Sequence, residues 1–263
     1  MMQKRSLWAV LFVMLLMALS VNGAVAEDDA LRSGDYQYRV LEDGTAEITH
    51  YFGRDSVVHI PETLDGKTVT SIRDGAFAEC SSLTSIELPD SVTSMGLNLF
   101  ADCWRLKNIQ VSPEQPVFAV IDGVLFNKAE KSLICYPAGK QEEAYEVPQG
   151  IQQIKSYAFY DCSALTSIEL PDSVTSIGEY AFAWCSSLTT IELPDSVTSI
   201  GDKAFRDCSA LTSIELPDSV TSIGNDAFFG CSALTNIELP DSVTSIGDQA
   251  FWGCNNLTVT ILQ

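Results

Sequence analysis

Residues 165–187 read LTSIELPDSVTSIGEYAFAWCSS, and three further copies of this unit follow with few changes. The copies begin at Leu165, Leu188, Leu211 and Leu234, which gives a constant period of 23 residues. A period of about 20–29 residues, with leucine or isoleucine at fixed places in each copy, is typical of leucine-rich repeat solenoids. The sequence therefore predicts a repeat coil rather than a globular domain.

Each repeat begins with a short predicted strand. Leu165, Ile168 and Leu170 have the spacing that turns aliphatic side chains inward, while Glu169 and its polar neighbours face water. The Pro-Asp-Ser segment 171–173 ends this strand, because proline cannot donate a ladder hydrogen bond and Asp and Ser favour turns. A parallel sheet with its aliphatic face inward follows from repetition of this strand.

The second half of the repeat completes the rung, meaning one full repeat of the coil. Val174 and Ile177 mark another short extended run, and residues 181–185 are expected to form a short helical or 3-10 turn that buries Phe182 and Cys185. The predicted fold class is an α/β repeat, a leucine-rich repeat solenoid of short parallel strands and short helical or 3-10 turns. Rungs must stack at roughly 4.8 Å to bury their apolar edges. The equivalent phenylalanines are expected to form one continuous column: Phe77, Phe100, Phe159, Phe182, Phe205, Phe228 and Phe251.

Residues 1–26 have the features of a secretory signal peptide. Lys4 and Arg5 supply a positive start, and the small residues 24–26, Ala-Val-Ala, suit cleavage before Glu27. The uncharged run between them is shorter than the roughly 20 residues that a membrane-spanning helix needs. We therefore expect a secreted or extracellular-surface protein that is not inserted in a membrane after cleavage.

The rest of the chain divides into a cap and a solenoid. Residues 27–54 alternate apolar and polar side chains around a turn at Asp43-Gly44, which predicts an N-terminal β-hairpin cap. Residues 55–263 form the predicted solenoid. The interval that precedes Leu165 is not a multiple of the period, so we expect inserted strands at about 112–146.

The repeat L-T-S-I-E-L-P-D-S-V-T-S-I-G-x-x-A-F-x-x-C resembles the BspA-like leucine-rich repeat. Residues 34–36 and 41–46 resemble the segment that often precedes such repeats, and residues 122–126 and 133–137 resemble a familiar interruption of them. The resemblance covers nearly all of residues 34–262. It implies a secreted or surface-displayed bacterial protein of a family linked to adhesion and protein binding, and it brings no catalytic residues.

The charge of the chain excludes two classes of partner. Acidic residues outnumber basic ones by 35 to 15, which gives a formal net charge of −20, and signal cleavage removes only Lys4 and Arg5. Such a chain repels nucleic acid and anionic membrane surfaces, so we expect neither as a partner.

Seven of the eight cysteines occupy one place in the repeat: Cys80, Cys103, Cys162, Cys185, Cys208, Cys231 and Cys254. Export favours disulfides, but parallel side chains about one rung apart are wider than a disulfide prefers. We expect a column of buried free thiols that pack as small apolar side chains, with rung-to-rung disulfides as the alternative. No Cys-x-x-Cys pair occurs, so we expect no zinc and no other metal site.

An acidic column is expected on the outward side of the first strand, at Glu169, Glu192, Glu215 and Glu238. Stacked like charges repel, which could favour calcium or a basic partner, while a solvated face is the simpler alternative. Neighbouring threonine columns raise an ice-binding alternative. Because the rungs are identical, they offer no pair of carboxylates whose environments would give them different pKa values, and the sequence has no nucleophile motif. We therefore expect neither an enzyme nor a cofactor.

The copies differ most in the two residues after the repeated phenylalanine. Tyr160, Trp184, Phe229 and Trp252 lie there and line an aromatic strip if their side chains point outward. Large apolar surface patches mark interaction sites, and aromatic side chains are frequent binding anchors. Local packing of these rings on the solenoid is the alternative.

These features together predict a non-catalytic secreted or cell-surface protein that binds a protein partner, in adhesion for example. The alternative is a carbohydrate-binding accessory protein that uses the exposed aromatics. The last strand, at 257–262, has no polar cap after it, which leaves self-association through the C-terminal edge open.

Overall fold

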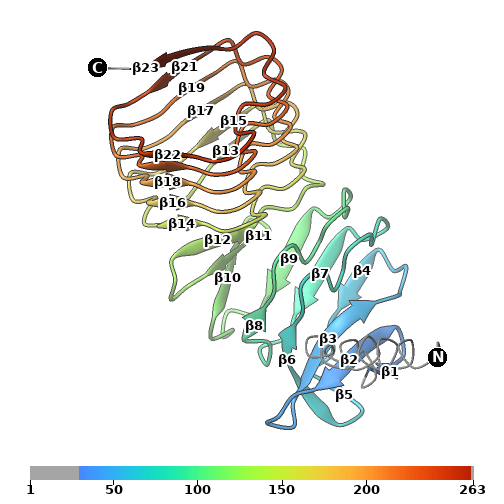
Figure 1. Ribbon diagram of the computed structural model, residues 1–263. Helices are drawn as coiled ribbons and strands as arrows, with labels where there is room; N and C mark the ends of the chain where they lie inside the picture. Colours follow the sequence, from blue (N-terminus) through green and yellow to red (C-terminus); the bar gives the residue numbers. More distant parts are fainter. Residues whose placement is uncertain (1–29, 262–263) are drawn as a thin grey trace, which may run out of the picture.

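The computed structural model describes residues 30–261, so the predicted signal peptide at 1–26 lies outside the described residues. Figure 1 shows a coil of stacked rungs that begins at an N-terminal sheet and runs to β23 (Thr258–Ile261). Every regular element within residues 30–261 is a β-strand, and no apolar helix of membrane-spanning length occurs there. The architecture is a leucine-rich repeat β-solenoid, and the predicted helical or 3-10 turns are wrong.

The first strands of the rungs form one side of the coil. Two parallel ladders make up this side, and each step from β15 to β21 advances the chain by one repeat, as in the pairing of Ser167 with Thr190. The shorter ladder comprises β4 (Val57–His59), β7 (Ser85–Leu88) and β9 (Asn108–Val111). The longer ladder comprises β13 (Ala144–Glu146), β15 (Ser167–Glu169), β17 (Thr190–Glu192), β19 (Ser213–Glu215), β21 (Asn236–Leu239) and β23.

The second strands form another side, which is also divided in two. The N-terminal sheet has the order β1 (Leu31–Ser33), β2 (Tyr36–Val40), β3 (Ala46–Tyr51), β6 (Lys67–Ile72) and β5 (Thr63–Leu64), with β8 (Ser94–Met95) paired to β6. The other sheet has the order β10 (Phe118–Ile121), β11 (Val124–Asn127), β12 (Ser132–Cys135), β14 (Gln153–Ile154), β16 (Ser176–Ile177), β18 (Ser199–Ile200), β20 (Ser222–Ile223) and β22 (Ser245–Ile246).

The segments around the repeated phenylalanines form the third side, here called the turn side. Tyr180 and Trp184 adopt left-handed backbone conformations, with φ of 54° and 61°. The N–H groups of Tyr180, Phe182 and Trp184 donate to carbonyls of the next rung at 2.8–2.9 Å. Ala183 and Cys185 instead donate to the residue three positions earlier in their own rung, at 3.2 Å. A helix cannot form here because alternate N–H groups bond to the next rung and not to their own segment. These hydrogen bonds offset the free-energy cost of the left-handed backbone conformation, which is about 1–2 kcal/mol per residue.

One glycine per regular rung permits close stacking. A Cβ atom at this position would lie 2.3–2.7 Å from backbone atoms of the preceding rung, as the structure shows at Gly178, Gly201, Gly224 and Gly247. None of these glycines has a left-handed φ, so they are needed for space rather than for backbone freedom. Arg73 and Lys155 occupy the equivalent position in two other rungs. There the preceding segment belongs to the cap or to the insertion, and not to a regular rung.

Six of the seven repeat cysteines are buried, as the sequence predicts, whereas Cys80 is half-buried. The Sγ atoms lie 3.0–3.1 Å from carbonyl oxygens of the preceding rung, in the pairs Cys185–Phe159, Cys208–Phe182, Cys231–Phe205 and Cys254–Phe228. All eight cysteines are free. Burial raises the pKa of the Cys185 thiol to about 12, so this thiol stays protonated and donates to the carbonyl.

The predicted single aromatic column is wrong, because the insertion divides it into two. Tyr51 of the cap lies 5.3 Å from Phe77, measured between ring centroids, and Phe77 lies 6.0 Å from Phe100. The second column begins at Tyr136 of the insertion, whose centroid is 5.3 Å from that of Phe159, and continues to Phe251 at 5.1–5.5 Å per step. A tyrosine from an irregular segment therefore begins each column.

Strand β11 separates the two hydrophobic cores at the insertion. It pairs antiparallel with β10 and β12, and β12 then pairs in parallel with β14 of the first regular rung that follows. Alternate side chains of a strand face opposite sides. Leu125 packs in the N-terminal core, whereas Val124 and Phe126 pack in the C-terminal core.

Replacing Gly201 by alanine should lower the free energy of unfolding by about 1–3 kcal/mol, because the new methyl group meets backbone atoms of Gly178 and Glu179. Urea denaturation measures the change. The matched control is Arg73→Ala at the same repeat position, where a Cβ atom is already accommodated and a change within about 0.5 kcal/mol is expected. Equal stability of Gly201→Ala and the wild type would contradict the close-approach argument.

The thiol column should make stability fall in alkaline solution. An exposed thiol in the unfolded chain ionises near 9.0, whereas folded Cys185 keeps its proton until about pH 12. The contribution of the buried thiol to the free energy of unfolding is therefore complete below pH 9. It is lost as the pH rises toward 12, and the free energy of unfolding falls by about 1.4 kcal/mol per pH unit for each such thiol. Urea unfolding between pH 7 and 11 measures the slope. Cys185→Ala should make this slope shallower, and an unchanged slope would contradict the prediction.

Candidate functional site

The acidic column lies on the outer surface of the first strands. Glu169, Glu192, Glu215 and Glu238 are all exposed, and the strand register places Glu192 opposite Glu215 and Glu215 opposite Glu238. None of the four forms an ion pair within residues 30–261. The structure thus brings these predicted site residues together as one stripe of negative charge, which we call the acidic face.

The acidic face offers no evident cation site. Within the described part of the chain, no group of three or more His, Cys, Asp or Glu side chains is arranged to hold a metal ion. The neighbouring threonine hydroxyls are used by the stack, because the Oγ1 atoms of Thr189, Thr212 and Thr235 lie 3.0–3.4 Å from a threonine carbonyl oxygen of the preceding rung. These columns therefore reinforce the ladder.

The predicted aromatic residues lie on the turn side. Tyr160, Trp184 and Phe229 are half-buried, and Trp252 is 64% exposed. Tyr160 and Trp184 contact each other, with ring centroids 5.1 Å apart. These side chains reach the surface and, at Tyr160 and Trp184, also pack against each other.

Two further tyrosines extend this group. Tyr157 and Tyr180 stack with ring centroids 4.8 Å apart, and Tyr180 lies nearly parallel to Trp184 at 6.2 Å. The spacing in the sequence does not indicate them, because they precede the repeated phenylalanine by two residues whereas Trp184 follows it by two. Only the folded turn places these two positions side by side.

Two cations complete the surface in a chain that is otherwise strongly acidic. The Arg206 guanidinium lies 4.2 Å from the Phe229 ring centroid and 5.9 Å from that of Trp184. Lys203 Nζ lies 4.7 Å from the Tyr180 centroid. We call this group the aromatic surface: Tyr157, Tyr160, Tyr180, Trp184, Phe229 and Trp252, with Lys203 and Arg206.

The geometry of the aromatic surface favours contact through ring edges. Tyr157 and Tyr180 stack face to face, and Arg206 lies over Phe229 and within cation–π range of Trp184. Arg206 is held by ion pairs to Asp207 at 3.3 Å and Asp226 at 3.5 Å. Rigid tyrosine, tryptophan and arginine side chains of this kind are the usual anchors of protein–protein interfaces. Trp252 is the exception, because much of its ring is open to solvent.

Comparison with known protein families gives one match. A family model described as "BspA type Leucine rich repeat region (6 copies)" matches residues 57–132 and 138–259, which is most of the chain. Among curated proteins, none matches the chain significantly.

Solved structures of bacterial leucine-rich repeat proteins are similar to this chain. A leucine-rich cell surface protein from Faecalibacterium prausnitzii is 24% identical, with 91% of this chain and 96% of that chain covered and a TM-score of 0.63. The pneumococcal vaccine antigen PcpA is 20% identical, with 89% of this chain and 88% of that chain covered and a TM-score of 0.58. These similarities show the solenoid fold.

Neutralising part of the acidic face should stabilise the protein at low ionic strength. The double variant Glu192→Gln and Glu215→Gln removes repulsion between opposed carboxylates and should raise the free energy of unfolding by up to about 1 kcal/mol. The gain should vanish in 1 M salt, where the screening length is about 3 Å. Thermal denaturation at both salt concentrations measures it.

The control for this prediction is Glu87→Gln, because Glu87 lies 2.6 Å from His59 Nδ1 and so already has a hydrogen-bonding partner. This variant should not gain stability. A gain in the double variant that persists in 1 M salt would contradict the electrostatic explanation.

Proposed function

Because the chain belongs to the BspA-type leucine-rich repeat family, we propose that it is a non-catalytic scaffold that binds a protein partner outside the bacterial cell, in adhesion for example. The partner contacts the aromatic surface on the turn side. The observation that carries this proposal is the packing of Arg206 between Trp184 and Phe229, which holds a rigid aromatic and cationic patch on an acidic solenoid.

The distribution of sequence variation among the rungs supports the turn side as the binding surface. Inward residues such as Phe182 and Phe205 repeat without change, and outward residues such as Glu192 and Glu215 also repeat. The aromatic and basic residues appear in only some rungs. A distinct patch on a repetitive frame can recognise a particular partner, whereas identical columns present the same chemistry at every rung.

The extracellular location in this proposal rests on residues 1–26, whose composition is that of a secretory signal peptide. Edman sequencing or intact mass of the exported protein tests it. A chain that begins at Glu27 supports export, and a retained Met1 in the cell fraction would contradict it.

Carbohydrate binding is the second candidate function, and Trp252 is the observation that favours it. Its ring is 64% exposed, and open aromatic faces can stack on sugar rings. Tyr157, Tyr180 and Phe229 favour a protein partner, because neighbouring side chains already occupy a face of each of these rings.

The double variant Trp184→Ala and Trp252→Ala should weaken partner binding by about tenfold or more, since each anchor typically contributes over 1 kcal/mol. Binding of the wild type and the variant is measured on arrays of purified extracellular proteins and of glycans. The control variant, Glu192→Gln with Glu215→Gln, keeps the aromatic surface and should bind the same protein with unchanged affinity.

Three other outcomes would redirect the proposal. Loss of protein binding in the glutamate variant alone would move the interface to the acidic face. Binding to glycans that depends on Trp252 would support the carbohydrate alternative. Turnover of a cell-wall glycan by the wild type would contradict a non-catalytic role. Circular dichroism confirms that each variant keeps its fold.

A further inference from the structure

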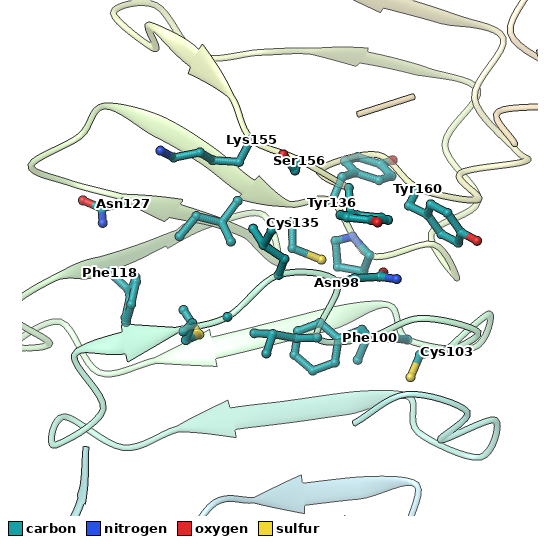
Figure 2. Close-up of a pocket in the computed structure, with 18 of the residues that line it drawn as sticks. Asn98, Phe100, Cys103, Phe118, Asn127, Cys135, Tyr136, Lys155, Ser156 and Tyr160 are labelled. Carbon is teal, nitrogen blue, oxygen red and sulfur yellow. The ribbon is translucent and has the colours of Figure 1, made fainter. Parts of the chain in front are cut away.

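The interruption of the solenoid leaves a pocket of about 290 Å³ on the side of the second strands and the turns. Met95, Leu97 and Phe100 line it from the N-terminal stack, and Tyr136, Tyr157 and Tyr160 line it from the C-terminal stack. Figure 2 shows Phe100 and Tyr136 on opposite walls, with Tyr160 beside Tyr136. On the first-strand side the stacks remain joined, since Gly139 N donates to Leu106 O at 2.8 Å.

The pocket lies where one ring of the aromatic column is missing. Rings within the C-terminal column follow each other at 5.1–5.5 Å. Phe100 contacts Phe77 on one side, and Tyr136 contacts Phe159 on the other, but no aromatic contact joins Phe100 to Tyr136 within residues 30–261. Phe100 is accordingly only partly buried, whereas Phe77 and Phe159 are fully buried. One bulky apolar side chain would restore continuity.

The pocket wall also carries backbone donors without partners. In the rung below, three N–H groups donate to carbonyls of the next rung at 2.7–3.1 Å, those of Gly75, Phe77 and Glu79. The equivalent N–H groups of Asn98, Phe100 and Asp102 have no acceptor among residues 30–261. Asn98 and Asp102 have left-handed φ values of 49° and 57°, close to those of Gly75 and Glu79, so the backbone follows the course of the rung below. Asn98 and Phe100 line the pocket.

Strand β8 supplies the matching acceptors. It pairs with β6 on one edge and with no described strand on the other. In regular rungs the equivalent carbonyls accept from the next rung, as Thr175 O does from Thr198 N at 3.1 Å and Ile177 O does from Gly201 N at 3.0 Å. The carbonyls of Thr93 and Met95 have no such donor within residues 30–261. The pocket wall therefore presents free backbone N–H and carbonyl groups with which a following rung would form hydrogen bonds.

The edge of the pocket is acidic. Asp102 and Asp161 occupy equivalent repeat positions on its two sides, and neither forms an ion pair with a described cation. Burial, and then the nearby Asp102 carboxylate, raise the pKa of Asp161. A basic side chain at this edge would relieve the repulsion between the two carboxylates.

We propose that this pocket binds an extended segment of another polypeptide as an added rung of the coil. The segment's backbone pairs with the free groups of β8 and of Phe100, and one bulky apolar side chain fills the place between Phe100 and Tyr136. A basic residue close to that side chain lies beside Asp102 and Asp161. The pocket shares Tyr157 and Tyr160 with the aromatic surface but is not lined by Trp184, Phe229 or Trp252, so this proposal does not depend on the partner interface.

The row of ladder groups favours a peptide over a small apolar molecule. The free acceptors lie on β8 and the free donors lie on the turn that follows it. In recognition by strand addition, the backbone of a peptide supplies the groups that are complementary to such free backbone groups. The cavity volume is at the lower limit of small-molecule pockets, which span about 300–1,000 Å³. It suits one large side chain whose backbone continues along the open edge.

A regular rung of this same protein provides a direct probe. A synthetic peptide of residues 197–208, VTSIGDKAFRDC with Cys208→Ser, carries the strand, the aromatic residue Phe205 and two basic residues. It should bind the full chain saturably in calorimetry. The same peptide with Phe205→Ser should bind at least about tenfold more weakly, and hydrogen exchange should show protection of residues 96–103 by the original peptide only.

Matched variants of the protein locate the site. Ala138 lines the pocket, and Ala138→Trp should fill it and weaken binding by at least about tenfold, whereas Ala210→Trp, at a similarly half-buried position in a regular rung, should have no effect. Asp102→Asn with Asp161→Asn should weaken binding at low salt, while Asp207→Asn should not. The variant Trp252→Ala removes an anchor of the aromatic surface that does not line the pocket. It should bind the peptide normally, so failure of this proposal is distinguishable from failure of the aromatic surface as an interface.

The outcomes separate the alternatives. Equal binding of the two peptides would overturn the proposal, because the missing ring would then play no part. Full binding of the peptide by the folded Ala138→Trp variant would overturn the proposal as well. Protection from hydrogen exchange at residues 249–254 would then place the peptide beside the last described rung. A co-purified lipid that the peptide cannot displace would assign the pocket to a small apolar ligand instead.

Discussion

Hydrogen bonding between rungs is the constraint on which the rest of this structure depends. A single rung leaves backbone donors and acceptors on both of its edges, and only another rung can pair with them. The close approach that this requires explains the glycine at Gly201 and its equivalents, where no Cβ atom fits. It also explains why threonine hydroxyls and cysteine thiols donate to carbonyls of the preceding rung, as Thr189 and Cys185 do.

The same constraint shows what the irregular segments contribute. Tyr51 of the cap and Tyr136 of the insertion each begin an aromatic column, so both segments replace the ring that a regular rung would supply. Strand β11 serves two cores at once, because its alternate side chains face opposite directions. The insertion joins the stacks on the first-strand side, where Gly139 bonds to Leu106, and a pocket remains open beside Phe100.

Function can vary on this frame only where stacking leaves side chains free. Inward positions are occupied by the repeated aliphatic residues, phenylalanines and cysteines, and their burial leaves little freedom for change. On the turn side, the positions next to the repeated phenylalanine point outward and differ from rung to rung. Arg206, Trp184 and Phe229 meet there because rungs 23 residues apart lie directly against one another. The aromatic surface is therefore a product of stacking rather than of any single repeat.

The sequence by itself determined the period, the inward positions, the thiol column and the stripe of glutamates, because these follow from local spacing and from exact repetition. It indicated Tyr160, Trp184, Phe229 and Trp252 as surface residues, since the copies differ at those positions. Only the tertiary structure decided that the turn side is not helical, since its hydrogen-bond partners lie a full repeat away and are absent from any local pattern. It also decided that Tyr157 and Tyr180 join the aromatic surface and that the aromatic column breaks between Phe100 and Tyr136. Those outcomes depend on how rungs and the insertion meet in space, which periodicity along one chain does not encode.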